Sequence, residues 1–258
     1  MTDFVSPPAS QVPLSGDASL SSPLTEARMA LETGDWPTAE TLYEAILQTL
    51  PTGSEAWALA GIVALQLGNP TLAAERLAQA RIRQPDDALT LVWLGQALAF
   101  SGQLAAALEP LETACGLAPT LYDAHHAWGT VLVELKRPLE AIRPLMRAVK
   151  LNPAAAPTWL TLGLALAATG EDEAAVGAMA QVIACQPEDA TGYHEFARHH
   201  LANGRPELAK PLFMQACALA PGDAQLHSDT SGCFDALGDM EAAVRHYDRA
   251  CDLDPTFA

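Results

Sequence analysis

Apolar residues recur along this chain of 258 residues in helix-length stretches separated by turns. The stretch WLTLGLALAATG, at residues 159–170, places apolar side chains at the i, i+3, i+4 and i+7 positions of one helix face. Gly170 can end that helix in a left-handed cap. A second helical stretch follows at once and must end before Pro187, because the residue ahead of a proline disfavours helix. The pattern predicts two helices joined by a tight turn.

Three residue types recur with this pattern at a constant spacing of 34 residues. Prolines mark the end of each period at Pro51, Pro85, Pro119, Pro153, Pro187, Pro221 and Pro255. An alanine stands twelve positions earlier, at Ala39, Ala73, Ala107, Ala141, Ala175, Ala209 and Ala243. A glycine, or once a lysine, stands seventeen positions earlier, at Gly34, Gly68, Gly102, Lys136, Gly170, Gly204 and Gly238. Agreement over seven periods indicates an internal repeat, in which the small alanine lets two helices approach closely.

The periods tile most of the chain without a gap. The predicted repeats are 20–53, 54–87, 88–121, 122–155, 156–189, 190–223 and 224–257, which together make an array over residues 20–257. Residues 1–19 and Ala258 lie outside it, and the Pro/Ser-rich leader, residues 1–19, is expected to be disordered. We call the first helix of each repeat helix A and the second helix B.

The repeat resembles a known family. The tetratricopeptide repeat (TPR) is 34 residues long and follows the pattern W-x2-L-G-x2-Y, then A-x3-F, then P. The fifth repeat matches it with Trp159, Leu162, Gly163, Leu166, Ala175, Met179 and Pro187. The resemblance implies an all-α fold, a right-handed α-solenoid (superhelix) of seven helix-turn-helix TPR units. In that fold, helices A line a concave groove and helices B form the convex back.

The resemblance also implies which residues face the groove, because positions 2, 5, 9, 12 and 13 of each repeat line it in the family. The candidate partner-binding residues are Ala58, Ile62, Leu65, Val92, Gln96, Phe100, His126, Thr130, Val133, Leu160, Leu164, His194 and Arg198. Most are apolar, which suits an amphipathic helix or an extended apolar peptide of a partner protein. The alternative is that several of them are covered by neighbouring coils of the superhelix.

Charge and composition narrow the partners. The chain has 14 Lys and Arg residues against 31 Asp and Glu residues, a net charge of −17. Such a chain repels phosphate backbones and anionic membranes, so neither nucleic acid nor membrane is expected as a partner. Residues 1–19 contain neither Lys nor Arg and no apolar run, which argues against a targeting signal and for a cytoplasmic protein.

The segment HEFARHH, residues 194–200, has the composition of a metal site. His194 and His199 are five residues apart, however, so a helix turns them about 140° from each other, and they cannot chelate one ion. The repeat register instead places His194 and Arg198 toward the groove. It places His199 and His200 between helices, where protonation is expected to loosen the sixth and seventh repeats near or below pH 6. No metal, cofactor or catalytic residue is predicted.

The last helix B is predicted to present Tyr247, Ala250 and Cys251 with no capping helix to cover them. This terminal face predicts self-association, docking of a partner, or a chain cut from a longer parent.

The sequence therefore predicts a protein-interaction scaffold or adaptor and not an enzyme. The alternative is a targeting or regulatory TPR module of a bacterial glycosyl-, sulfo- or methyltransferase system whose catalytic part is a separate chain or missing.

Overall fold

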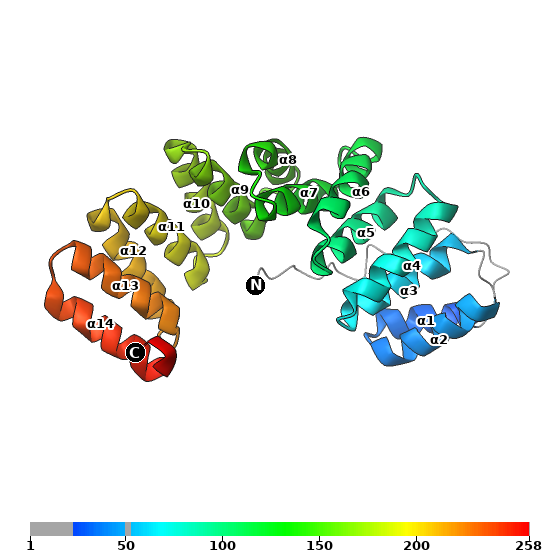
Figure 1. The fold of residues 1–258 in the computed structure, drawn as a ribbon, viewed down its shortest axis with the longest axis horizontal. Coiled ribbons are helices and arrows are strands. Elements are labelled where there is room, and N and C mark those ends of the chain that lie inside the picture. The colour runs from blue at the N-terminus through cyan, green and yellow to red at the C-terminus, as the bar shows by residue number, and fades with distance from the viewer. Residues whose placement is uncertain (1–22, 50–52, 258) are drawn as a thin grey trace. The chain divides into compact units, whose positions relative to one another are not determined.

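A computed structural model describes residues 23–49 and 53–257 of the chain (Figure 1). The predicted disordered leader, residues 1–19, lies outside the described residues. Fourteen α-helices and a final 3₁₀ helix, η2 (Pro255–Phe257), make up the described part, which contains no strand.

The helices alternate between the predicted A and B positions. The A helices are α1 (Pro23–Glu32), α3 (Ser54–Gln66), α5 (Ala88–Phe100), α7 (Tyr122–Glu134), α9 (Ala156–Ala168), α11 (Ala190–Ala202) and α13 (Ala224–Ala236). The B helices are α2 (Trp36–Thr49), α4 (Pro70–Arg83), α6 (Leu104–Leu117), α8 (Pro138–Leu151), α10 (Asp172–Cys185), α12 (Pro206–Leu219) and α14 (Met240–Leu253). From α3 onward, equivalent helices begin and end 34 residues apart. The predicted all-α solenoid built from a 34-residue helix pair is therefore confirmed.

Left-handed backbone at one position explains the tight turn within each repeat. Positive φ angles occur at Gly34, Gly68, Gly102, Lys136, Gly170, Gly204 and Gly238. At Gly170 the φ angle is 80°, and the next amide, of Glu171, donates to the carbonyl of Leu166 at 2.9 Å. This bond closes the end of α9 and lets α10 begin at Asp172. Lys136, with φ 60°, is the one residue of the described ranges that adopts this conformation without being glycine.

Small residues bring helices A and B together. Each of the seven register alanines is buried, and six of them have no exposed surface. On helix A, a Cβ atom added to Gly95 would lie 2.4 Å from Cγ of Leu111 on α6. The two helices can therefore pack at this distance only because Gly95 has no side chain.

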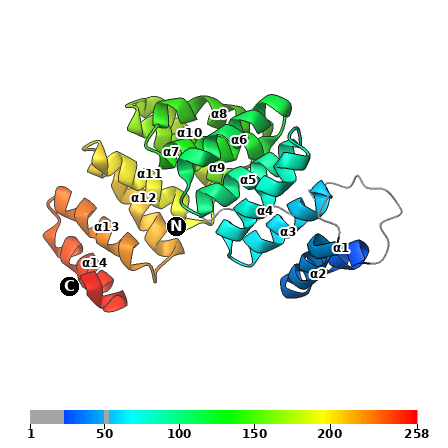
Figure 2. The same ribbon diagram turned by 45° about the vertical axis from the view of Figure 1, so that its right-hand side comes forward.

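The chain divides into two compact units, residues 1–137 (unit 1) and 138–258 (unit 2). Unit 1 contains α1 to α7, and unit 2 contains α8 to α14, with each helix packed against the next one within its unit (Figures 1 and 2). The boundary falls after Arg137, between helices A and B of the fourth repeat.

Candidate partner-binding site

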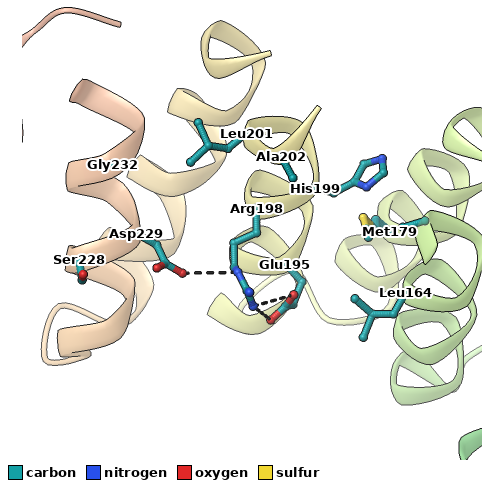
Figure 3. Close-up of a pocket in the computed structure, with 11 residues that line it drawn as sticks. Leu164, Met179, Glu195, Arg198, His199, Leu201, Ala202, Ser228, Asp229 and Gly232 are labelled. Carbon is teal, nitrogen blue, oxygen red and sulfur yellow. Dashed lines mark hydrogen bonds and ion pairs between the residues drawn. The ribbon is translucent and has the colours of Figure 1, made fainter. Parts of the chain in front are cut away.

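A pocket of about 510 Å³ opens on the A helices of unit 2 (Figure 3). It is lined by Leu164, Ala167, Met179, Glu195, Arg198, His199, Leu201, Ala202, Ser228, Asp229 and Gly232. All but Met179 come from α9, α11 and α13. The pocket therefore runs across three successive repeats and includes the predicted groove residues Leu164 and Arg198.

One end of the pocket is apolar. Leu164 on α9 is 39% exposed although it is a leucine, and Ala167 lies one turn further along the same helix. Met179 contributes from α10 but is itself buried in the core. Leu164 is thus the main apolar side chain that a partner could cover at this end.

The other end of the pocket is polar and carries charges of both signs. Arg198 Nη1 donates to Glu195 Oε1 at 3.1 Å, and its Nε lies 3.5 Å from Asp229 Oδ2 on α13. His194 Nε2 donates to the same carboxylate oxygen at 2.8 Å, and Gln225 donates to the other oxygen at 2.8 Å. Burial opposes the ionisation of Asp229, but the bonds from His194 and Gln225 lower its pKa below the usual value. The predicted His194/Arg198 pair is therefore locally balanced by carboxylates.

The histidines of HEFARHH have separate environments. His199 and His200 are both buried, as the repeat register predicts. His199 lies beside Asn203 and 4.0 Å from a carboxylate oxygen of Asp172, whereas the His200 ring stacks on Phe196 with ring centroids 4.7 Å apart. Burial, followed by the nearby His199 and Arg205, lowers the pKa of His200. The neutral form of His200 is therefore favoured in the fold.

The candidate groove residues of unit 1 differ in exposure. Four of them are at most 6% exposed and belong to the packed interior: Ala58, Ile62, Val92 and Thr130. Four others are half-buried: Leu65, Gln96, His126 and Val133. Only Phe100 is clearly exposed, at 47%. The prediction that the first four contact a partner is corrected, because covered side chains offer it almost no surface.

His126 and Leu160 complete the predicted set. The His126 ring stacks on Tyr122 with centroids 5.6 Å apart, and burial lowers the pKa of His126 to about 4. Its ring is therefore neutral at physiological pH and fits an apolar surface. In unit 2, Leu160 on α9 is half-buried, one helical turn before Leu164.

The predicted terminal face on α14 needs one correction. Ala250 is fully buried and cannot belong to a docking face. Tyr247 is 44% exposed and Cys251 is half-buried. The exposed apolar residues Met240 and Val244 precede Tyr247 at helical spacing and form a stripe with it.

Two groups of polar residues were missed by the sequence patterns. In unit 1, the buried Arg76 on α4 donates to Glu40 at 2.8 Å, to Glu44 at 3.4 Å and to the carbonyl of Ala60 at 3.1 Å. The two glutamates lie about one repeat earlier in the sequence, so only the register of the repeats could have suggested the ion pairs. In unit 2, a cysteine and two histidines meet between α12, α13 and α14.

Comparisons with known proteins agree with the repeat pattern. A family model described as tetratricopeptide repeat matches residues 24–75, 58–121, 126–190 and 194–256. Protein FlbA of Caulobacter vibrioides is 29% identical to the chain over 178 residues, which are 69% of this chain and 24% of FlbA. The chain thus spans about a quarter of the length of this relative.

Solved structures share the fold at low identity. The C-terminal part of a TPR repeat-containing protein from Cytophaga hutchinsonii is 17% identical, with a TM-score of 0.70, over 90% of this chain and 95% of that one. YrrB, described as a TPR protein with an unusual peptide-binding site, is 20% identical, with a TM-score of 0.61, over 71% of this chain and 94% of YrrB. In the described ranges, no helix has the length and apolar character that crossing a bilayer requires.

Proposed function

Because the chain belongs to the tetratricopeptide repeat family, we propose that it is a non-enzymatic adaptor that binds an amphipathic segment of a partner protein in the pocket of unit 2. The observation that carries the proposal is the composition of the pocket. An exposed leucine at one end and a half-exposed arginine at the other offer an apolar contact and a hydrogen-bond donor within one cavity.

The polar end favours a partner with an acidic or carbonyl group. The Asp229 carboxylate already accepts hydrogen bonds from His194 and Gln225, so both of its oxygens have partners inside the unit. The Arg198 side chain is 55% exposed in spite of its contacts with Glu195 and Asp229. A guanidinium has five N–H donors, and two contacts do not exhaust them. Arg198 is therefore the group through which the pocket can donate a hydrogen bond to a carbonyl or carboxylate of the partner.

The apolar end favours an aliphatic or aromatic side chain of the same segment. Leu164 and Ala167 share one face of α9, and Leu160 lies on that face one turn earlier. An amphipathic helix or an extended peptide can place one apolar side chain here and an acceptor at Arg198. The high negative charge of the chain supports protein over nucleic acid as the partner, and we propose that it acts in the cytoplasm.

A peptide-display selection on the whole chain tests this function. We expect enriched peptides to combine an apolar residue with an acidic residue, and Leu164→Glu to abolish their binding. The matched control is Leu208→Glu, because Leu208 on α12 is 54% exposed and does not line the pocket. Equal loss of binding in both variants, or in neither, would contradict the proposed site.

We also propose a second candidate function, in which the array is one part of a larger enzyme system. The similarity covers only 24% of FlbA, so in that relative the repeats are part of a much longer protein. The corresponding proposal is that this array directs a bacterial glycosyl-, sulfo- or methyltransferase to its substrate protein. Reconstitution tests this candidate function with a transferase that is encoded beside the gene of this chain. Adding the array to the transferase should lower its KM for the acceptor protein, and an unchanged KM would reject the candidate.

A further inference from the structure

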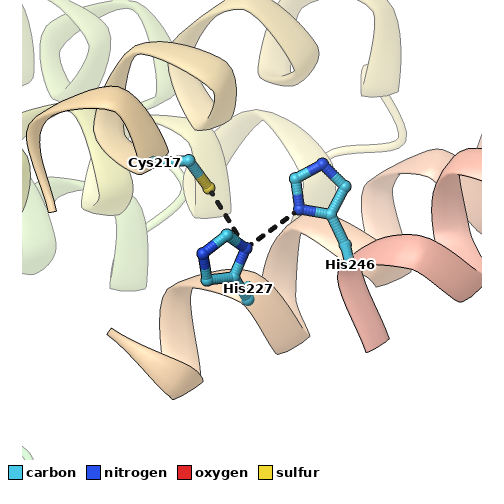
Figure 4. A group of neighbouring side chains, drawn as sticks. All are labelled: Cys217, His227 and His246. Carbon is cyan, nitrogen blue, oxygen red and sulfur yellow. Dashed lines mark hydrogen bonds between the residues drawn. The ribbon is translucent and has the colours of Figure 1, made fainter. Parts of the chain in front are cut away.

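Three metal-ligating side chains meet near the end of unit 2 (Figure 4). Cys217 comes from α12, His227 from α13 and His246 from α14. The sulfur of Cys217 lies 3.9 Å from Nδ1 of His227, and that nitrogen lies 3.1 Å from Nδ1 of His246. The three ligand atoms all lie within 4.8 Å of one another. Three different helices thus direct one sulfur and two nitrogens at the same point.

Two of the three separations lie close to the edges of a tetrahedral zinc site, and the third, between the Cys217 sulfur and the His246 nitrogen, is within 4.8 Å. Zn–N bonds of about 2.0–2.1 Å and Zn–S bonds of about 2.3 Å place tetrahedral nitrogens about 3.3 Å apart, and a sulfur about 3.6 Å from a nitrogen. The observed N–N and S–N distances of 3.1 and 3.9 Å differ from these edges by a few tenths of an ångström. The half-buried His246 ring can supply that adjustment, because one side of it is not enclosed by the core.

The surroundings orient His227 as a ligand. Its Nε2 donates to the backbone carbonyl of Pro221 at 3.3 Å, which leaves Nδ1 with a lone pair toward Cys217 and His246. Metal-binding histidines usually donate their second ring N–H to such an acceptor. In the fifth repeat, Trp159 at the same repeat position donates to the equivalent carbonyl, of Pro153, at 2.8 Å. The histidine therefore keeps a hydrogen bond of the repeat and adds a nitrogen that tryptophan lacks.

The other two ligands are also held. The Cys217 sulfur lies 3.3 Å from the hydroxyl of the buried Thr230, which donates its own proton to the Leu226 carbonyl at 2.7 Å and so accepts from the thiol and holds it in place. The His246 ring stacks on Phe234 with centroids 5.3 Å apart. Burial raises the pKa of the Cys217 thiol, and burial together with His227 and Arg245 lowers the pKa of His246. Without a metal, the neutral forms are favoured, and the Nδ1–H of His246 donates to His227.

A second Cys/His pair occurs at the same repeat positions earlier in the array. Cys115 and His125 occupy the same repeat positions as Cys217 and His227, 102 residues earlier in the sequence. His125 Nε2 likewise donates to the carbonyl of Pro119, at 3.1 Å. The position equivalent to His246 is Pro144, which offers no ligand atom. The earlier pair therefore lacks the third ligand.

We propose that Cys217, His227 and His246 bind one Zn²⁺ ion, or another divalent ion that accepts thiolate and imidazole ligands, with a fourth position open to water or to an external ligand. Binding displaces the thiol proton of Cys217 to solvent, and His246 shifts its ring proton from Nδ1 to Nε2. The ion joins α12, α13 and α14, so it stabilises the last two repeats. This site lies outside the partner-binding pocket, and its test does not depend on the proposed function.

Titration of the whole, reduced chain with Co²⁺ and then Zn²⁺ tests the site. Thiolate coordination should give a sulfur-to-cobalt charge-transfer band, and tetrahedral geometry should give intense visible bands. Zn²⁺ should abolish both at one equivalent per chain. Isothermal titration with Zn²⁺ alone should give the same stoichiometry, and bound Zn²⁺ should raise the thermal midpoint.

Variants assign the ligands. Cys217→Ser should remove the charge-transfer band, and His246→Gln should weaken Zn²⁺ binding by more than about 100-fold, beyond the 10–100-fold typical of outer-shell changes. Cys115→Ser is the matched control and should bind as the unaltered chain does. Cys217 is buried, so Cys217→Ser can fail to fold, whereas a glutamine should be accommodated at the half-buried position 246. If the metal-free His246→Gln chain has unchanged helicity, its loss of Zn²⁺ binding tests the site on its own. No cobalt charge transfer, or equal losses in Cys115→Ser and Cys217→Ser, would overturn the proposal.

Discussion

The two compact units place polar residues in their interiors by different means. Unit 1 buries a permanent charge, Arg76, and surrounds it with Glu40, Glu44 and a backbone carbonyl. Unit 2 buries histidines, among them His199, His200 and His227, which are neutral unless they are protonated. Unit 1 also holds the buried His125 and the half-buried His126, whose pKa burial lowers to about 4, so the units differ in the ion-pair network of unit 1 and not in the presence of histidines.

This difference predicts that the units respond to different conditions. An arginine remains charged at any pH that a protein survives, so its network in unit 1 depends on the partner carboxylates alone. Neutral buried histidines become unfavourable as the pH falls, and their nitrogens are also metal ligands. Unit 1 should therefore be sensitive to substitution at Arg76 and its partners and, through His126, to pH, whereas unit 2 should be sensitive to pH and to divalent ions.

The largest expected effect is in the unit 1 network. Glu40→Ala should lower the free energy of unfolding of unit 1 by about 3 kcal/mol, because it leaves the buried guanidinium of Arg76 without its nearer carboxylate. Arg76→Met should be less harmful, since it removes the buried charge and keeps an apolar stem. Urea denaturation followed by segment-resolved hydrogen exchange measures both.

Glu44→Ala is the matched control for that experiment. The Glu44 side chain is 55% exposed and 3.4 Å from Arg76, so its removal should cost less than about 1 kcal/mol. If Glu40→Ala and Glu44→Ala lower the free energy of unfolding equally, then the burial of an ion pair does not determine how much it stabilises the unit. A change in the hydrogen exchange of unit 2 in either variant would contradict the view that this network stabilises unit 1 alone.

Helix packing gives the next largest effect. A Cβ atom at Gly95 in unit 1 would lie 2.4 Å from the branch point of Leu111, whereas at Gly163 in unit 2 it would lie 3.2 Å from the flexible side chain of Met179. Overpacking a core costs about 1–3 kcal/mol, and alanine in a helix gains about 0.5–1 kcal/mol over glycine. We expect Gly95→Ala to destabilise by about 1–2 kcal/mol and Gly163→Ala to be nearly neutral in thermal unfolding. The reverse order would show that the unit 1 helices separate more easily than those of unit 2.

The repeat pattern predicted the fold because each of its signals is local. The glycine that ends helix A, the alanine that packs helix B and the proline that ends the repeat act within one repeat, and their spacing alone fixes the helix bounds. Lys136 kept the left-handed conformation of its register even though it is not glycine. The register therefore predicts backbone conformation more reliably than residue type does at that position.

The candidate sites could be predicted only in part, because their geometry depends on contacts between repeats. The register placed Leu164 and Arg198 on the pocket side and His199 and His200 in the interior, but it gave no sign that Asp229 would bond His194 across helices. The ligands Cys217, His227 and His246 have no local motif spacing. They become neighbours only because three helices pack around one point.

The buried histidines predict loss of stability in acid. His200 has a lowered pKa in the fold, whereas in the unfolded chain it protonates near 6.5. Below that pH the unfolded chain binds more protons than the folded one, so stability falls as the pH drops through 6.5 toward the folded pKa. His246 contributes in the same direction. His126 of unit 1, whose pKa is lowered to about 4, contributes as well, so we expect a lower thermal midpoint at pH 5.5 than at pH 7.5, with faster hydrogen exchange in α7 and in α11 to α14.

The variant His200→Leu tests whether His200 contributes to this pH response. His200→Leu should reduce the shift of the midpoint between the two pH values, because leucine cannot take up a proton. The matched control is His194→Gln, since His194 lies on the same helix and glutamine can also donate a hydrogen bond to the Asp229 carboxylate. A midpoint that does not change with pH, or a full shift in His200→Leu, would contradict the assignment.

The smallest effect is expected at Lys136 in unit 1, where one helix cap departs from the glycine found at the other six. Left-handed backbone costs a residue with a Cβ atom roughly 1–2 kcal/mol, and Lys136 adopts it with φ 60°. Lys136→Gly removes this strain but adds about 0.5–1 kcal/mol of conformational entropy to the unfolded chain. The net gain should be a few tenths to about 1 kcal/mol, visible as a small rise in the urea midpoint. Lys136→Asn helps to separate the effect of backbone strain on stability from the effect of the lysine charge. Asparagine tolerates the left-handed conformation and, like glycine, is uncharged. If both variants are less stable than the lysine chain, then the charge of Lys136, which favours the ionised form of the nearby Glu134, outweighs the strain.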